Sequence, residues 1–370
     1  MEQKLIHTPD GVRDLYGTEL RAKKNTEKKI IEKFRMYGYK EIETPAFEYF
    51  DIFSNEIGTT PSRELYKFFD KEGDTLVLRP DFTPSIARCA SKYFLENGEE
   101  ARLCYSGRAY NNTLSLQGKL KETTQVGAEF INDGKADADA DVLAMVIETM
   151  KEIGFKDFTV SIGQVDFFKG LCDEAGLDDD AIARLREQIS VKNYFGAAEF
   201  LSEHNVSDKI QELLLKSGDV LDADELNVLI DETGNEKSKK ALLRLKEVYE
   251  LMELQGLSQY ISIDLGMLSK FHYYTGIIFK AYTYGAADAV VKGGRYDGLL
   301  EKFGKKAPAI GCVFLLDDIM SALNALGLIE DDDESPEVIE YTDADREEAF
   351  KKIAALRASG KPAYGRHCRR

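Results

Sequence analysis

Hydrophobic residues recur along the chain with two different periods. Apolar side chains spaced i, i+3, i+4 and i+7 predict an amphipathic helix over 139–153, and alternation over 158–162 predicts a strand. A first helix is expected over 18–37, where Gly38 ends it. These are the periods of a chain that mixes helices and strands.

Thr83 and Pro84 predict the start of a further helix, because threonine is a good N-cap and proline suits the first helical position. Other apolar runs predict strands at 75–79, 102–108, 123–131, 260–265, 274–282, 287–291 and 309–315, then a helix at 317–326. The strands cluster, and few helices alternate with them. This order favours an α+β fold, an antiparallel sheet flanked by helices, over a doubly wound sheet.

The pattern changes between residues 167 and 256. Leu, Glu, Lys and Asp dominate this stretch and several glycines interrupt it, which predicts a helical insert. The insert divides the expected core into two parts, residues 1–166 and 257–329.

An acidic linker over 330–336 precedes the C-terminal part. Residues 337–370 are predicted to form a truncated α/β segment with one strand, 337–341, and one helix, 343–359. We expect the basic end, 366–370, to fray.

Composition excludes several classes of protein. An apolar fraction of 43% fills a core, so the chain is not disordered. No apolar run approaches the roughly 20 residues of a membrane span, and the first residues lack a signal-peptide pattern, so the cytoplasm is the expected location. The net charge of -17 disfavours a large RNA partner. Five scattered cysteines without a CxxC pair and four dispersed histidines predict reduced thiols, no metal site and no cofactor.

The strand around Gln125 to Glu129 carries the most informative polar residues. Alternation places Gln125, Gly127 and Glu129 on one face. A glycine between two polar residues is typical of a site where a ligand approaches the backbone, and the flanking amide and carboxylate suit an amine or an imidazole. The alternative is a solvent-facing polar side of an antiparallel strand.

Two further polar candidates precede or follow predicted elements. Asp81 and Thr83 lie just before a helix, where they either accept hydrogen bonds from a substrate ammonium or complement the helix dipole. Arg108 ends a strand, where it either clamps a carboxylate or phosphate or is a surface arginine.

Gly293 to Leu299 predicts a glycine-rich turn between a strand and a helix. It matches neither the P-loop nor the dinucleotide fingerprint. Tyr273 and Tyr274 offer aromatic walls and hydroxyl groups, or else ordinary strand packing.

The order of these motifs resembles the histidyl-tRNA synthetases over residues 5–326. The opening 8–14 resembles their start, and 38–45 resembles the first class II synthetase motif, which builds a dimer interface. Arg108 with Gln125–Glu129 resembles the second motif. The tyrosine pair and Gly293–Leu299 resemble the two peptides peculiar to histidine-specific synthetases. The resemblance implies a class II synthetase-like core and self-association as a dimer.

The resemblance also implies a surviving amino-acid pocket. Its histidine-binding residues would be Asp81 (where the family has Glu), Thr83, Arg108, Gln125, Glu129, Tyr273 and Tyr274.

The catalytic half departs from the family pattern. Ser269 stands where the family has its catalytic arginine, and Asp318 stands where an arginine contacts ATP. Losing one well-placed donor lowers a rate by on the order of 10²–10³. We therefore expect no synthetase activity and no catalytic residues.

A core that keeps the pocket and loses these cations resembles the regulatory subunits of short-form ATP phosphoribosyltransferase. Residues 337–370 are also too few for an anticodon-binding domain, which implies no tRNA partner. The resemblance implies assembly with a small catalytic subunit into a hetero-octamer, for the first step of histidine biosynthesis, with feedback by histidine as allosteric effector. The alternatives are a divergent histidyl-tRNA synthetase and a stand-alone paralogue.

Overall fold

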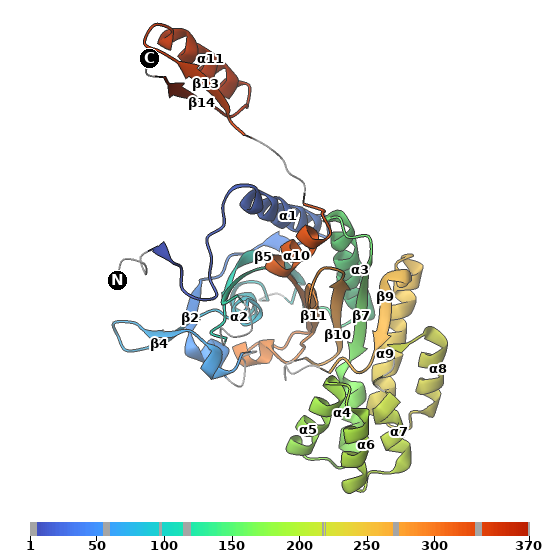
Figure 1. Ribbon diagram of the computed structural model, residues 1–370. Helices are drawn as coiled ribbons and strands as arrows, with labels where there is room; N and C mark the ends of the chain where they lie inside the picture. Colours follow the sequence, from blue (N-terminus) through green and yellow to red (C-terminus); the bar gives the residue numbers. More distant parts are fainter. Residues whose placement is uncertain are drawn as a thin grey trace. The chain divides into compact units, whose positions relative to one another are not determined.

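The protein divides into two compact units in a computed structural model. The large unit includes Lys23–Leu328 and the small one includes Ile329–Arg370 (Figure 1). The structure describes residues 6–54, 60–95, 98–113, 120–216, 218, 220–268, 274–329 and 335–368. None of the helices in these ranges is both long enough and apolar enough to cross a lipid bilayer.

A nine-stranded sheet forms the centre of the large unit, in the order β1-β5-β6-β12-β11-β10-β7-β9-β8. Its strands are β1 (Lys40–Glu41), β5 (Ala101–Tyr110), β6 (Glu122–Ile131), β7 (Phe158–Gln164), β8 (Val220–Leu221), β9 (Ile261–Asp264), β10 (Ile277–Thr283), β11 (Val291–Arg295) and β12 (Ala309–Leu315). Only β1–β5 and β7–β9 are parallel pairs. The predicted α+β class with a largely antiparallel sheet is confirmed.

Helices cover both faces of this sheet. On one face, α1 (Gly17–Met36) packs Phe34 against Phe314 of β12, with ring centroids 5.6 Å apart. The helices α3 (Ala136–Glu152) and α10 (Leu316–Ala325) contact β12 as well. On the other face, α2 (Thr83–Tyr93) shares a buried cluster with Leu103 and Tyr105 of β5. The apolar stripe predicted over 139–153 is therefore the buried side of α3.

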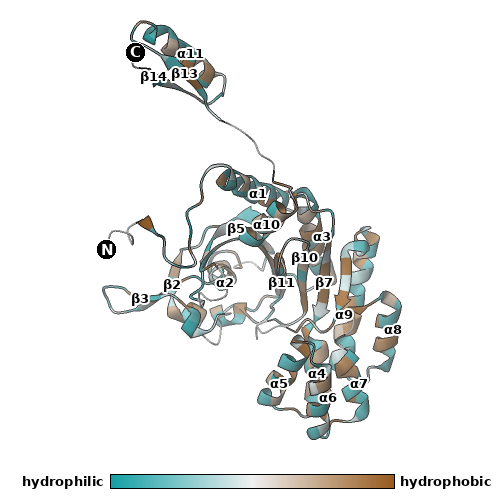
Figure 2. Ribbon diagram, viewed as in Figure 1, coloured by the Kyte–Doolittle hydropathy of each residue, from teal (hydrophilic) through white to brown (hydrophobic). Residues whose placement is uncertain are grey.

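The described part of the predicted insert contains six helices. They are α4 (Val165–Glu174), α5 (Asp179–Ser190), α6 (Tyr194–Glu203), α7 (Asp208–Lys216), α8 (Ala223–Glu232) and α9 (Glu236–Leu254). Hydrophilic and hydrophobic residues alternate along α5, α6 and α8 in Figure 2, which is typical of amphipathic helices. The insert also contributes β8 to the sheet. The division of the chain at residues 167 and 256 stays a prediction.

Two smaller sheets complete the described structure. One is antiparallel, with β2 (Phe47–Tyr49) and β3 (Lys67–Phe69) on either side of β4 (Thr75–Leu78). The other lies in the small unit, where β13 (Glu337–Tyr341) and β14 (Ala363–His367) are parallel and α11 (Arg346–Ala358) connects them.

The fraying predicted for the basic end is wrong at Arg366 and His367. Both residues belong to β14 and pair with Glu340 and Tyr341 of β13. The backbone of this polar segment bonds to its neighbour strand, and the Cys368 N–H continues the pairing to the Tyr341 carbonyl.

Two local predictions also need correction. Thr83 is the first residue of α2 and not its N-cap, because its hydroxyl donates to another part of the structure. The strand expected at 287–291 is instead β11, which spans Val291–Arg295 and so includes the glycines predicted to form a turn. A Cβ on Gly293 would lie 2.2 Å from Phe279 Cζ and 2.4 Å from the Gly311 carbonyl oxygen. Gly293 is therefore a close-packing position inside the sheet.

We predict that Gly293→Ala lowers the free energy of unfolding by about 1–3 kcal/mol, because the added methyl overpacks the sheet. Gly298→Ala is the matched control from the same motif, since a Cβ there meets nothing within 4 Å. Denaturant unfolding of both variants measures the difference. Equal stabilities would contradict the close packing at Gly293.

Candidate functional site

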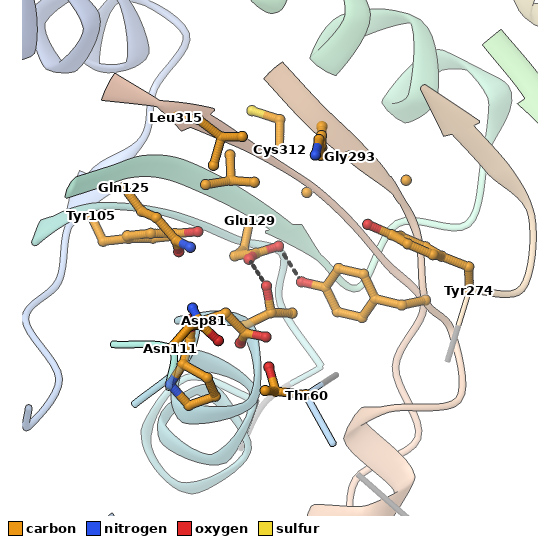
Figure 3. Close-up of a pocket in the computed structure, with 17 residues that line it drawn as sticks. Thr60, Asp81, Tyr105, Asn111, Gln125, Glu129, Tyr274, Gly293, Cys312 and Leu315 are labelled. Carbon is orange, nitrogen blue, oxygen red and sulfur yellow. Dashed lines mark hydrogen bonds between the residues drawn. The ribbon is translucent and has the colours of Figure 1, made fainter. Parts of the chain in front are cut away.

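A cavity of about 310 Å³ opens between the sheet and the start of α2 (Figure 3). Its volume lies at the small end of the range for ligand pockets. The described residues that line it are Thr60, Pro80, Asp81, Thr83, Tyr105, Asn111, Gln125, Glu129, Tyr274, Lys292, Gly293, Gly294, Tyr296, Gly311, Cys312, Val313 and Leu315. The cavity thus draws on segments from across the large unit.

Glu129 of β6 places a carboxylate in the wall of this cavity with only 1% of the residue exposed. The Thr83 hydroxyl donates a hydrogen bond to Oε1 at 2.8 Å, and the Tyr296 hydroxyl donates to Oε2. Burial raises the pKa of Glu129 to about 7, although both hydroxyl groups favour the charged form. The carboxyl group is therefore poised to change charge near neutral pH.

Glycines on the neighbouring strands make room for these polar groups. A Cβ on Gly311 of β12 would lie 1.7 Å from the Glu129 carboxylate, so only glycine fits opposite it. At Gly127, a Cβ would lie 2.3 Å from the Tyr105 hydroxyl oxygen. The space above Gly127, predicted as a point of ligand approach, is thus taken by the Tyr105 side chain.

Five of the predicted residues line one cavity. Asp81 and Thr83 come from the start of α2, Gln125 and Glu129 from β6, and Tyr274 from the segment before β10. The solvent-facing alternative for the β6 residues is wrong, because Gln125 is 9% exposed and Glu129 is nearly inaccessible. Figure 3 shows Gln125 and Glu129 pointing into the same space.

The structure does not bring Arg108 into this group. Its side chain is 52% exposed and forms an ion pair with Glu122 at 2.8 Å. Arg108 lies an odd number of residues from Tyr105, so the two side chains point to opposite faces of β5. The predicted contact between Arg108 and a ligand carboxylate stays a prediction.

The remaining predicted positions are not among the described residues that line the cavity. Tyr273 and Ser269 lie outside the described residues. Asp318 is exposed in the first turn of α10.

Sequence reasoning missed several lining residues, among them Tyr105, Asn111, Lys292 and Tyr296. Side chains alternate along β5, so Tyr105 is expected on the face that lines the cavity. The same alternation, extended just past the end of the strand, places Asn111 on this face and Arg108 on the opposite one. The Asn111 amide donates to the Pro80 carbonyl at 3.1 Å, which holds it at the cavity wall. Tyr296 belongs to the glycine-rich motif, but nothing local indicates that its hydroxyl reaches Glu129.

The charges of the cavity suit a small ligand with N–H donors. Asp81 and Glu129 supply carboxylates, and Lys292 is the one cationic residue among the described lining residues. Lys292 itself pairs with Asp288 at 2.9 Å. Within the described residues, no group of three His, Cys, Asp or Glu side chains is placed to hold a metal ion.

Comparisons with known proteins identify the family of the chain. The family model for histidyl-tRNA synthetase matches residues 11–319. The ATP phosphoribosyltransferase regulatory subunit of Acetivibrio thermocellus is 39% identical over 366 residues, which cover 97% of this chain and 86% of that protein. The chain belongs to the family of ATP phosphoribosyltransferase regulatory subunits.

Further members of this family and solved structures are similar as well. The regulatory subunit of Ruminiclostridium cellulolyticum is 37% identical, over 96% of this chain and 85% of its own. A Bacillus halodurans structure described as an ATP phosphoribosyltransferase regulatory subunit/histidyl-tRNA synthetase is 30% identical, with a TM-score of 0.87 over 98% of this chain and 93% of its own. A Nostoc histidyl-tRNA synthetase has a TM-score of 0.82 at 18% identity, over 99% of this chain and 86% of its own. The synthetase-like fold of this regulatory-subunit chain is therefore confirmed.

We predict that Glu129 makes stability depend on pH between about 4.5 and 7. Its pKa is raised in the folded state, so the stability it contributes is complete below its unfolded pKa and is lost as the pH rises through about 7. The loss amounts to at most about 3 kcal/mol. Denaturant unfolding of the wild type and Glu129→Gln at pH 4.5, 6 and 8 measures it. Parallel pH profiles for the two proteins would contradict the raised pKa.

Proposed function

We propose that this chain is the non-catalytic regulatory subunit of a short-form ATP phosphoribosyltransferase and that it binds histidine in the cavity described above. It supports the activity of the catalytic subunit in the first step of histidine biosynthesis and confers feedback inhibition by histidine. The observation that carries the histidine part is the buried Glu129 carboxylate, held by Thr83 and Tyr296 in a cavity of amino-acid size.

The polar groups around Glu129 fit the chemistry of histidine. The Glu129 and Asp81 carboxylates accept hydrogen bonds from N–H groups, which an ammonium and an imidazole both supply. Tyr274 provides an aromatic wall. Asn111, Gln125 and Lys292 provide side-chain N–H donors for a ligand carboxylate. Arg108 and Tyr273 remain proposed contacts of the bound ligand.

The charges of the site support the proposed absence of synthetase activity. Adenylation requires cations around a triphosphate, and Lys292 is the single cation among the described lining residues. The residue that precedes Asp318 has a packing role. Asp317 accepts hydrogen bonds from the Lys23 ammonium and the Thr124 N–H, each at 2.6 Å, and so ties α10 to α1 and β6. The neighbouring Asp318 adds a negative charge at the position where the synthetases have an arginine that contacts ATP.

The quaternary part of the proposal is a hetero-octamer. The regulatory subunits associate as dimers and bind the small catalytic subunits in the cytoplasm, without a tRNA partner. The names of its relatives support the catalytic partner in this proposal, because a regulatory subunit implies a catalytic one.

We predict that Glu129→Gln weakens histidine binding by about tenfold or more, because it removes a charged acceptor from a buried site. Isothermal titration calorimetry of the purified chain measures the affinity. The matched control is Glu152→Gln in α3, whose carboxylate pairs with Lys33 of α1 at 3.3 Å, because neither residue is among those that line the cavity. Equal losses in both variants, or no binding by the wild type, would contradict histidine binding at this site.

A second prediction concerns activity. Mixed with the catalytic subunit from the same organism, the chain should raise the rate at which ATP and phosphoribosyl pyrophosphate are joined, and histidine should lower that rate. The chain alone should not catalyse histidine-dependent exchange of pyrophosphate into ATP. Measurable exchange would instead support the alternative, a divergent histidyl-tRNA synthetase.

A further inference from the structure

The helical insert touches one wall of the cavity at its base. The Val165 N–H, at the start of α4, donates to the Gly276 carbonyl at 3.2 Å. The half-buried Lys169 ammonium on the same helix donates to the Tyr274 carbonyl at 3.2 Å. The Tyr274 ring also packs against the buried cluster that contains Val165. Helix α4 therefore helps to set the position of the Tyr274 wall.

A second connection starts from α9 at the other side of the insert base. Nε and Nη2 of Arg244 lie 2.9 and 2.8 Å from Oδ2 of Asp139 in α3. The Asp139 side chain is 0% exposed, and its other oxygen accepts hydrogen bonds from Nε and Nη2 of Arg295 at 2.8 and 2.5 Å. One buried carboxylate thus joins the insert to the end of β11.

Arg295 extends this connection to two of the tyrosines that line the cavity, Tyr274 and Tyr296. Its carbonyl accepts a hydrogen bond from the Thr275 N–H at 2.8 Å, one residue after Tyr274. Tyr296, which donates to Glu129, is the next residue along the chain. A Cβ on Gly276 would lie 3.1 Å from Arg295 Cδ, so the arginine side chain packs directly on the backbone beyond Tyr274.

The two helices of the insert base are bonded tightly to each other. The Ser238 hydroxyl of α9 donates to the Phe167 carbonyl of α4 at 2.9 Å in a buried contact. A Cβ on Gly170 would lie 2.3 Å from the Ser238 hydroxyl oxygen, so the helices are in close contact. Lys169 and Arg244 consequently belong to one packed body.

Stability alone is a weak reason for the buried charges in this connection. A buried Arg–Asp–Arg group can usually be replaced by apolar residues without loss of stability. A close-packed interior, by contrast, transmits small displacements between the elements it joins.

We propose that α4 and α9 respond to whether a ligand is bound in the cavity. A ligand that shifts the Tyr274 wall displaces Lys169 directly and Arg244 through Asp139 and Arg295, and the insert then changes its position or its local stability. The insert is in this way the part of the chain through which bound ligand affects the complex with the catalytic subunit. This inference rests on the proposed function, because histidine is the ligand that it assumes.

Hydrogen–deuterium exchange of the full chain with and without saturating L-histidine tests the proposal. We expect histidine to change exchange in α4 and α9 as well as in β6 and β12. In Lys169→Met we expect about threefold to thirtyfold weaker binding, and at saturation the changes in α4 and α9 should shrink while the changes in β6 and β12 remain. Arg244→Gln should have the same effect, and each variant serves as the second test if the other fails to fold.

The matched control is Lys237→Met. Lys237 also joins α9 to α4, through an exposed pair with Asp173 at 2.9 Å, but neither residue lines the cavity. The affinity of Lys237→Met for histidine and its exchange changes on histidine binding should stay within about twofold of those of the wild type. Histidine binding that leaves exchange in α4 and α9 of the wild type unchanged would overturn this inference alone. Absence of histidine binding to the wild type would remove the proposed function and this inference with it.

Discussion

A carboxylate buried in the middle of a sheet is the constraint on which the site depends. An isolated charge in such a place loses its hydration, so the surrounding chain must supply hydrogen bonds. Thr83 and Tyr296 supply them from two segments far apart in sequence, and Gly311 leaves the space that the carboxylate fills. These requirements account for the threonine at the start of α2 and for the tyrosine that follows the glycine-rich strand.

What could be predicted from the sequence is what depends on local periodicity. Alternation placed Gln125 and Glu129 on one face of β6, and the spacing of apolar residues gave α3. Periodicity does not say whether a polar strand face meets solvent or a cavity, because that depends on which helix packs above it. Thr83 shows the same limit, since an N-cap and a buried hydroxyl donor look alike in sequence. The position of β11 was missed because glycine normally signals a turn, and here the tight packing of three strands requires it.

The family relationship explains how one fold serves two kinds of protein. The synthetase-like architecture is shared with a histidyl-tRNA synthetase at 18% identity, so most residues can differ while the fold is kept. The buried acid and its hydroxyl partners belong to the packing between sheet and helix. A cation at the cavity rim is not constrained in this way and can be replaced at little cost in stability. The cavity around the buried acid can therefore be kept in a family whose rim residues differ.

The open sheet of the large unit ends on both sides in very short strands. In the described part of the chain, β1 and β8 each contain two residues, and those of β1 are Lys40 and Glu41. Short or charged outer strands offer few free backbone groups for another chain to pair with, which is how natural proteins avoid uncontrolled edge-to-edge aggregation. Contact with another chain at either end of this sheet would therefore use side-chain surfaces and not the addition of strands.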